Sequence, residues 1–114
     1  MTNNSIYLRF DVWLVPLDPT IGHEIKKTRP CVIISPNELS QLSTVLVAPL
    51  TTQGFKFPSR IKCLFQNKSG FILLDHMRAV DKRRLIKKLG TLDKHTARRI
   101  CDILQEMFSF EEEY

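Results

Sequence analysis

The sequence predicts a mainly β protein, a small antiparallel β domain followed by one C-terminal helix. Six short apolar or alternating runs occupy the first three quarters of the chain, each bounded by Pro, Gly, Asn, Asp or Ser. After Gly90 the apolar period changes to that of a helix. A chain of 114 residues holds one hydrophobic core, so a single domain over residues 1–114 is expected.

The predicted strands cover residues 11–17, 30–35, 44–50, 60–65, 70–74 and 77–80. The runs 32–34 and 45–47 are apolar without alternation, which predicts central strands that are covered on both faces. Pro16 and Pro49 are expected near strand ends or bulges, since proline cannot donate a ladder hydrogen bond.

Residues 94–108 are predicted to form the main helix. Ala97, Ile100, Leu104 and Phe108 recur at helical spacing, and Asp93 is placed to cap the N-terminus. One face should therefore pack on the sheet. A shorter helix is expected over residues 83–89, with Gly90 ending it.

Charge favours a polyanionic partner. The net charge is +5, but residues 1–104 carry 17 bases and eight acids, or +9, because four of the twelve acids lie beyond residue 104. Nucleic acid is the first candidate, and a solvated cationic face is the alternative. The densest basic run, residues 82–88, has the same two interpretations.

Cysteine and histidine spacing predicts neither a disulfide framework nor a structural metal. Cys31, Cys63 and Cys101 are odd in number, far apart and in apolar context, which is typical of buried thiols in a reducing compartment. No zinc-ligand spacing occurs. No signal peptide or bilayer-spanning stretch is found, so a cytoplasmic protein without membrane contact is expected.

The loop before the second predicted strand is rich in ionisable groups. His23 is a proton carrier and Glu24 a carboxylate, while Lys26, Lys27 and Arg29 are phosphate binders. Each has a plainer alternative: a histidine bonded to backbone, an exposed acid, or a surface salt bridge. Arg29 suits charge stabilisation better than proton transfer because a guanidinium stays protonated.

A second group of candidates lies at later strand ends. Thr51 and Thr52 can place hydroxyls on a phosphate, although such a pair is often only β-forming and turn-bonding. Asp75 can activate a hydroxyl, hold Arg78, or simply form a salt bridge. Residues 55–60 alternate rings with cations, as in single-strand binding loops, and Phe57 is the predicted stacking ring, unless one ring merely closes the end of the barrel.

Four segments together resemble the MazF/PemK family of bacterial toxin endoribonucleases. They are Asp18-Pro-Thr-Ile-Gly-His-Glu with Thr28-Arg-Pro, Val47-Ala-Pro-Leu-Thr-Thr, the Phe57-Pro58 pair, and Leu74-Asp-His-Met-Arg-Ala-Val-Asp. Their order and spacing fit the family from about Asp11 to Phe108, a core of about residues 10–108. The resemblance implies an SH3-like barrel with a C-terminal helix, the MazF/PemK/CcdB-type fold.

The resemblance also implies an activity. It is that of a type II toxin–antitoxin toxin: a sequence-specific, metal-independent and cofactor-free endoribonuclease that cleaves single-stranded RNA, leaving a 2′,3′-cyclic phosphate and a 5′-hydroxyl. A homodimer and a cognate antitoxin protein are the implied partners. The family is also the reason to rank Arg29 and Thr51 first, because they match its catalytic arginine and threonine.

Two further catalytic candidates and eight RNA-binding residues complete the expected site. Asp75 matches a functional aspartate in part of the family, although some relatives carry an arginine where this chain has Leu73. His23 joins it on chemical grounds. The residues expected to bind RNA are Glu24, Lys26, Lys27, Thr52, Lys56, Phe57, Arg60 and Arg78.

Two other functions remain open from sequence. One is a CcdB-like non-enzymatic toxin that binds DNA gyrase; the ending Phe108-Ser-Phe-Glu-Glu-Glu-Tyr lacks the Trp-Gly-Ile associated with that activity. The other is an inactive RNA-binding barrel, against which the presence of both Arg29 and Thr51 argues.

Overall fold

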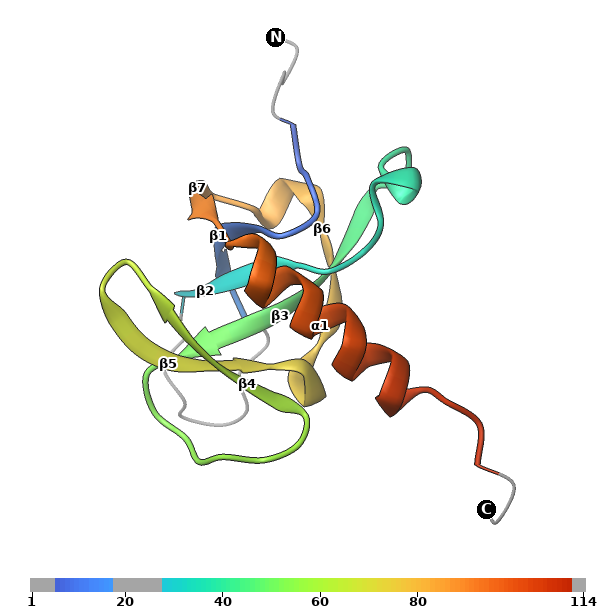
Figure 1. Ribbon diagram of the computed structural model, residues 1–114. Helices are drawn as coiled ribbons and strands as arrows, with labels where there is room; N and C mark the ends of the chain where they lie inside the picture. The colour runs from blue at the N-terminus through green and yellow to red at the C-terminus, as the bar shows by residue number, and fades with distance from the viewer. Residues whose placement is uncertain (1–5, 18–27, 112–114) are drawn as a thin grey trace, which may run out of the picture.

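Seven antiparallel strands and one long helix make up the computed structural model, which describes residues 6–17 and 28–111 (Figure 1). The strands are β1 (Asp11–Pro16), β2 (Thr28–Ile33), β3 (Thr44–Thr51), β4 (Arg60–Phe65), β5 (Lys68–Leu73), β6 (Arg78–Asp81) and β7 (Lys87–Thr91). The helix is α1 (Lys94–Met107), and single 3-10 turns cover Asn37–Leu39, Leu74–His76 and Lys82–Arg84. All six predicted strands are confirmed, with ends that differ by one or two residues.

The strands form one curled sheet in the order β4-β5-β3-β2-β1-β7, with β6 paired to β3 outside this path. Strand β3 has three partners: it pairs β6 through residues 44–47, β2 through 47–49 and β5 through 50–51. Pro49 lies where β3 leaves β2 for β5, a point at which a missing N–H is tolerated. This change of partner places Thr51 between β2 and β5.

Two hydrophobic cores lie on opposite faces of the sheet. One contains Val32, Ile34, Leu50, Ile61, Ile72 and Ile100, and the other contains Trp13, Val15, Cys31, Ile33, Val47 and Val80. Strand β2 contributes to both, so the prediction that it is covered on both faces is confirmed. The same prediction is wrong for residues 45–47, because Leu46 is 39% exposed.

Helix α1 lies across one face of the sheet (Figure 1). Its buried residues are Ala97 and Ile100, at the helical spacing seen in the sequence. Asp93 occupies the predicted N-cap position, although its side chain makes no capping hydrogen bond, and interaction with the Thr96 side chain lowers the pKa of Asp93. The predicted helix is therefore confirmed, with its last residue at Met107.

The short helix predicted over residues 83–89 is wrong. A 3-10 turn ends at Arg84, and β7 then pairs with β1. The backbone groups of this segment complete the edge of β1, which outweighs a weak local helical preference. Gly90 is a strand residue at a register shift, where a Cβ would lie 3.2 Å from the Phe65 ring.

The hairpin of β4 and β5 folds back towards β7 and curls the sheet into a barrel-like shape. Its two-residue turn places Gln66 and Asn67 at φ 51° and 64°, which suits a tight hairpin. Gln66 Nε2 donates to the carbonyl of Leu89 at 3.1 Å. The predicted class, a small antiparallel barrel with a C-terminal helix, is confirmed. Within the described residues, no helix combines the length and apolarity required to cross a membrane.

Candidate active site

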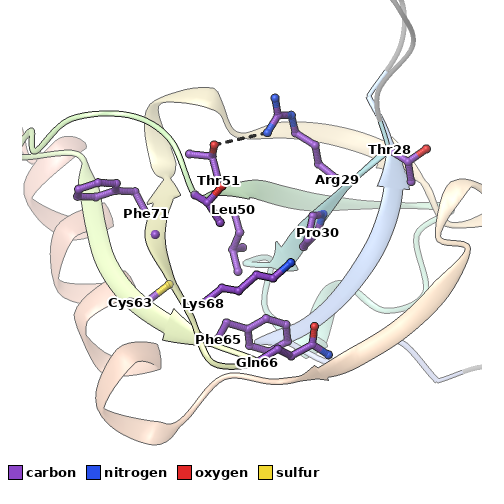
Figure 2. A pocket seen from close by; sticks show the side chains of 12 residues that line it. Thr28, Arg29, Pro30, Leu50, Thr51, Cys63, Phe65, Gln66, Lys68 and Phe71 are labelled. Carbon is purple, nitrogen blue, oxygen red and sulfur yellow. Dashed lines mark hydrogen bonds between the residues drawn. The ribbon is translucent and has the colours of Figure 1, made fainter.

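Arg29 and Thr51 meet at the ends of two neighbouring strands. The β2–β3 register pairs Cys31 with Pro49, and its continuation sets Arg29 opposite Thr51. Arg29 Nη1 donates to Thr51 Oγ1 at 3.5 Å, and Gln53 N donates to the same oxygen at 3.1 Å (Figure 2). With two donors already directed at it, the hydroxyl keeps its own proton for another acceptor. The structure thus joins the two residues that the sequence ranked first.

A buried thiol holds the backbone beside Arg29. Cys31 is fully buried, and its Sγ lies 3.6 Å from the carbonyl oxygen of Arg29. Burial raises the pKa of the Cys31 thiol to about 12, so the group stays neutral and can donate weakly to that carbonyl. Its role is structural, as its sequence context predicted.

Two clefts share Arg29 and Thr51 as a common border. The first, of about 470 Å³, is lined by Thr28, Arg29, Pro30, Leu50, Thr51, Thr52, Cys63, Phe65, Gln66, Lys68, Gly70 and Phe71 (Figure 2). The second, of about 420 Å³, is lined by Leu17, Arg29, Pro49, Thr51, Gln53, Gly54, Arg60, Leu73, His76 and Arg78. The first cleft has aromatic walls and the second has three guanidinium groups. A strand of nucleic acid crossing Arg29 would enter both.

Asp75 is engaged by Arg60, not by Arg78 as one prediction had it. Arg60 Nε and Nη2 donate to the two carboxylate oxygens at 3.3 and 3.2 Å, and Ser59 Oγ donates at 3.1 Å. The hydrogen bonds from Arg60 hold the pKa of Asp75 below its usual range, and Ser59 adds to this effect. Arg78 donates instead to the backbone carbonyl of His76, at 3.5 Å.

The same arginine orders the loop after β3. The Arg60 guanidinium lies 4.7 Å from the centroid of the Phe55 ring, and Phe55 and Phe57 form a tilted pair 6.3 Å apart. Both rings are more than half exposed. Phe57 and Lys56 line neither cleft, whereas Thr52 lines the first, and Arg60 and Arg78 line the second. The ring loop therefore borders the second cleft through Arg60.

Four predicted residues lie outside the described part of the chain: His23, Glu24, Lys26 and Lys27. Among the described residues, no group of three or more His, Cys, Asp or Glu side chains is arranged to hold a metal ion. His76, which was not among the residues predicted for the site, lines the second cleft, and its Nε2 lies 3.5 Å from Asp75 Oδ2. The protein thus presents an imidazole next to its guanidinium groups.

The hairpin contributes cleft residues that sequence reasoning missed: Phe65, Gln66, Lys68, Gly70 and Phe71. A signal existed, since Gln66-Asn67 between two apolar runs is a plausible two-residue turn that sets Phe65 opposite Lys68. Gly70 packs directly on β3, where a Cβ would lie 2.2 Å from the carbonyl oxygen of Thr51. Only glycine fits at this approach.

Most of the basic side chains in the run 82–88 make hydrogen bonds or ion pairs within the protein. Lys82 bonds the carbonyl of Ser40, and Arg83 pairs with Asp81 at 3.1 Å. Arg84 donates to the carbonyl of Pro16 at 2.6 Å, and Lys88 Nζ lies 3.5 Å from the buried carboxylate of Asp11. These contacts favour a structural role for the run over an extended RNA track.

A family model described as PemK-like, MazF-like toxin of type II toxin-antitoxin system matches residues 8–108. The endoribonuclease toxin ChpB of Escherichia coli K12 is 33% identical over 99 residues, covering 79% of this chain and 84% of ChpB. Endoribonuclease EndoA of Bacillus subtilis 168 is 32% identical over 108 residues, covering 88% of this chain and 92% of EndoA. A crystal structure of MazF from Deinococcus radiodurans has the same fold, with a TM-score of 0.77 at 20% identity over 94% of this chain and all of that one.

The structure defines the class of protein: a basic, curled β-sheet domain with an arginine–threonine pair between two clefts. The chain belongs to the PemK-like, MazF-like family of type II toxin–antitoxin toxins. The resemblance found in the four sequence segments is therefore confirmed.

Proposed function

We propose that this protein is the toxin of a type II toxin–antitoxin pair and acts as a sequence-specific endoribonuclease on single-stranded RNA. The observation that carries the proposal is the Arg29–Thr51 pair at the border of two clefts. RNA in this position would set one phosphate against the pair and extend a nucleotide to either side. The family and the names of the relatives supply the reaction class.

The proposed reaction is an internal transesterification. The ribose 2′-oxygen forms a bond to phosphorus, the bond to the 5′-oxygen breaks, and a 2′,3′-cyclic phosphate and a 5′-hydroxyl result. One proton leaves the 2′-hydroxyl and one is delivered to the departing 5′-oxygen. The phosphorane between these steps carries extra negative charge, and preorganised donors stabilise it. Arg29 supplies the fixed charge, and Thr51 supplies a hydroxyl whose proton is free for a phosphate oxygen.

The proton carriers are assigned by position. His76 lines the second cleft beside Arg29, and its side chain is 47% exposed, so substrate and water can reach it. His23 remains the candidate from the loop. Asp75 is a weak base because its pKa is lowered, so we assign it the positioning of Arg60 and His76. This reaction needs no metal ion and no organic cofactor.

The proposed partners follow from charge and family. A groove that binds phosphates also suits the acidic segment of an antitoxin, at an association rate that falls as salt rises. Such a segment should cover Arg29 and compete with RNA. We further propose a homodimer, since a barrel of this size with one helix leaves exposed apolar side chains, and a cytoplasmic location.

The test is an end-mapping assay on a long RNA in the presence of EDTA. Wild type should cleave the RNA, spare duplex DNA and leave 5′-hydroxyl ends. Arg29→Ala should lose about a hundredfold or more in kcat, because one preorganised donor is removed. Arg98→Ala removes the same charge from the exposed face of α1, away from both clefts, and should leave kcat unchanged. A folded Arg29→Ala protein with normal turnover, or cleavage that depends on added magnesium, would refute this mechanism.

A further inference from the structure

The first cleft is larger and more apolar than phosphate binding requires. Beyond Arg29 and Thr51 it continues along β5 to the hairpin turn, and its walls include the rings of Phe65 and Phe71 (Figure 2). Both rings are only partly buried, so their remaining surface faces the cleft or solvent. Phosphate oxygens gain nothing from such walls, whereas a nucleobase stacks on them.

Lys68 adds a cation to this cleft. It stands opposite Phe65 at the hairpin turn, and Figure 2 shows its side chain running across the cleft towards Pro30. Within residues 6–17 and 28–111, the side chain of Lys68 makes no hydrogen bond or ion pair. The ammonium group offers three donors and can contact an acceptor on a base edge. Other cations near the hairpin do not share this position; Lys62 lines neither cleft.

Gln66 complements this donor. Its Nε2 is committed to the carbonyl of Leu89, which fixes the amide and leaves its carbonyl oxygen as an acceptor at the cleft. A base edge that carries both an acceptor and an N–H donor thus meets matching groups from Lys68 and Gln66. The volume of about 470 Å³ is within the range of small-ligand sites.

We infer that the first cleft is a subsite for one nucleobase of a nucleotide that adjoins the cleaved phosphate, stacked on Phe65 or Phe71 and contacted at its edge by Lys68. The inference rests on the proposed function for the position of the phosphate. RNA is favoured over a protein segment because the cleft begins at the phosphate-binding pair and combines flat rings with edge-directed polar groups. The subsite makes Lys68 and Phe71 determinants of base preference at one position.

Binding tests the subsite without relying on cleavage. Single-stranded oligonucleotides that carry 2′-deoxyribose at the cleavage position are titrated by fluorescence anisotropy, with an abasic nucleotide placed at each position in turn. For wild type, one abasic position beside the cleavage position should weaken binding about fivefold or more, the usual effect of losing one stacked base. In Lys68→Met and Phe71→Leu that same abasic substitution should cost much less. Lys62→Met is the matched control and should behave as wild type.

Cleavage of a random-sequence RNA pool gives the second readout. Lys68→Met should relax the base preference at one position beside the cut and keep the preferences elsewhere, a change that a merely structural role would not produce. The subsite is wrong if abasic penalties in Lys68→Met and Phe71→Leu equal those of wild type, or if antitoxin binding alone is weakened. Base-dependent binding without any cleavage would keep the subsite and overturn the endoribonuclease proposal instead.

Discussion

Gly70→Ala is expected to disable the site without removing any polar side chain. Gly70 lies on β5 beside the two residue pairs that join β5 to β3, Leu50 with Ile72 and Thr51 with Phe71. An alanine Cβ at this position would be 2.2 Å from the Thr51 carbonyl oxygen and 3.2 Å from Thr52 Cα. These are backbone atoms, so no side chain can rotate out of the way.

The size of the effect follows from the required separation. Contacts below 3.0 Å are essentially never seen for a Cβ, so the two strands must part by 0.8 Å or more next to Thr51. The Arg29–Thr51 hydrogen bond is already 3.5 Å long and has no slack. A displacement of about 1 Å at a catalytic group can reduce the rate about a hundredfold. Overpacking of this kind typically costs about 1–3 kcal/mol of stability, which leaves most domains folded.

The assay compares kcat and urea unfolding for Gly70→Ala and a matched control. Val80→Ala removes buried volume from the core on the opposite face of the sheet. Its expected loss of stability is similar to that of Gly70→Ala, because burial of a whole valine side chain contributes roughly 1.5–3 kcal/mol. Val80→Ala should keep near-normal kcat, whereas Gly70→Ala should lose about a hundredfold. A folded Gly70→Ala protein with near-normal kcat would refute the view that close strand contact positions Thr51.

Three further predictions concern charge, burial and assembly. The Asp75 pKa is lowered in the folded state, so its contribution to stability is present above its usual value of 3.8 and is lost as pH falls through the lowered pKa. Asp75→Asn should therefore be less stable than wild type in urea at pH 7, and the difference should shrink as pH falls below 3.8. A difference independent of pH would contradict this. Burial raises the Cys31 pKa from 9.0 to about 12, so Cys31 in the native protein should resist iodoacetamide at pH 8. The stability of wild type should also fall between pH 9 and 12 more steeply than that of Cys31→Ala. Labelling of Cys31 at the rate of the unfolded chain would count against the assignment. The protein should be a homodimer at micromolar concentration, which light scattering checks, and a monomer mass would exclude it.

Local pattern determined much of the architecture. Runs of Val, Ile, Leu and Phe bounded by turn residues gave six strands, and the 3.6-residue period after Asp93 gave α1, because both signals depend only on neighbours along the chain. The exception was residues 83–89. This segment includes the start of β7, because it pairs with the edge of β1, which lies about 75 residues earlier in the chain.

The site divides in the same way. Arg29 and Thr51 could be proposed from sequence because family-like segments surround them and their type suits phosphate chemistry, and the structure shows that the two side chains meet. The partner of Asp75 was not found, since Arg60 and Arg78 are both near it in sequence and only the fold selects Arg60. The cleft residues Lys68 and Phe71 carried no motif at all.

What the sequence by itself determined is therefore the set of elements and the chemical groups available to them. What the tertiary structure alone decided is which groups meet: the register that sets Arg29 opposite Thr51, the hairpin that brings Lys68 to the same cleft, and the glycine that lets β5 approach Thr51. The physical reason is that strand pairing and register are non-local. A shift of one residue reverses the face of every side chain in a strand, and packing of the whole sheet, not local preference, selects the register that is observed.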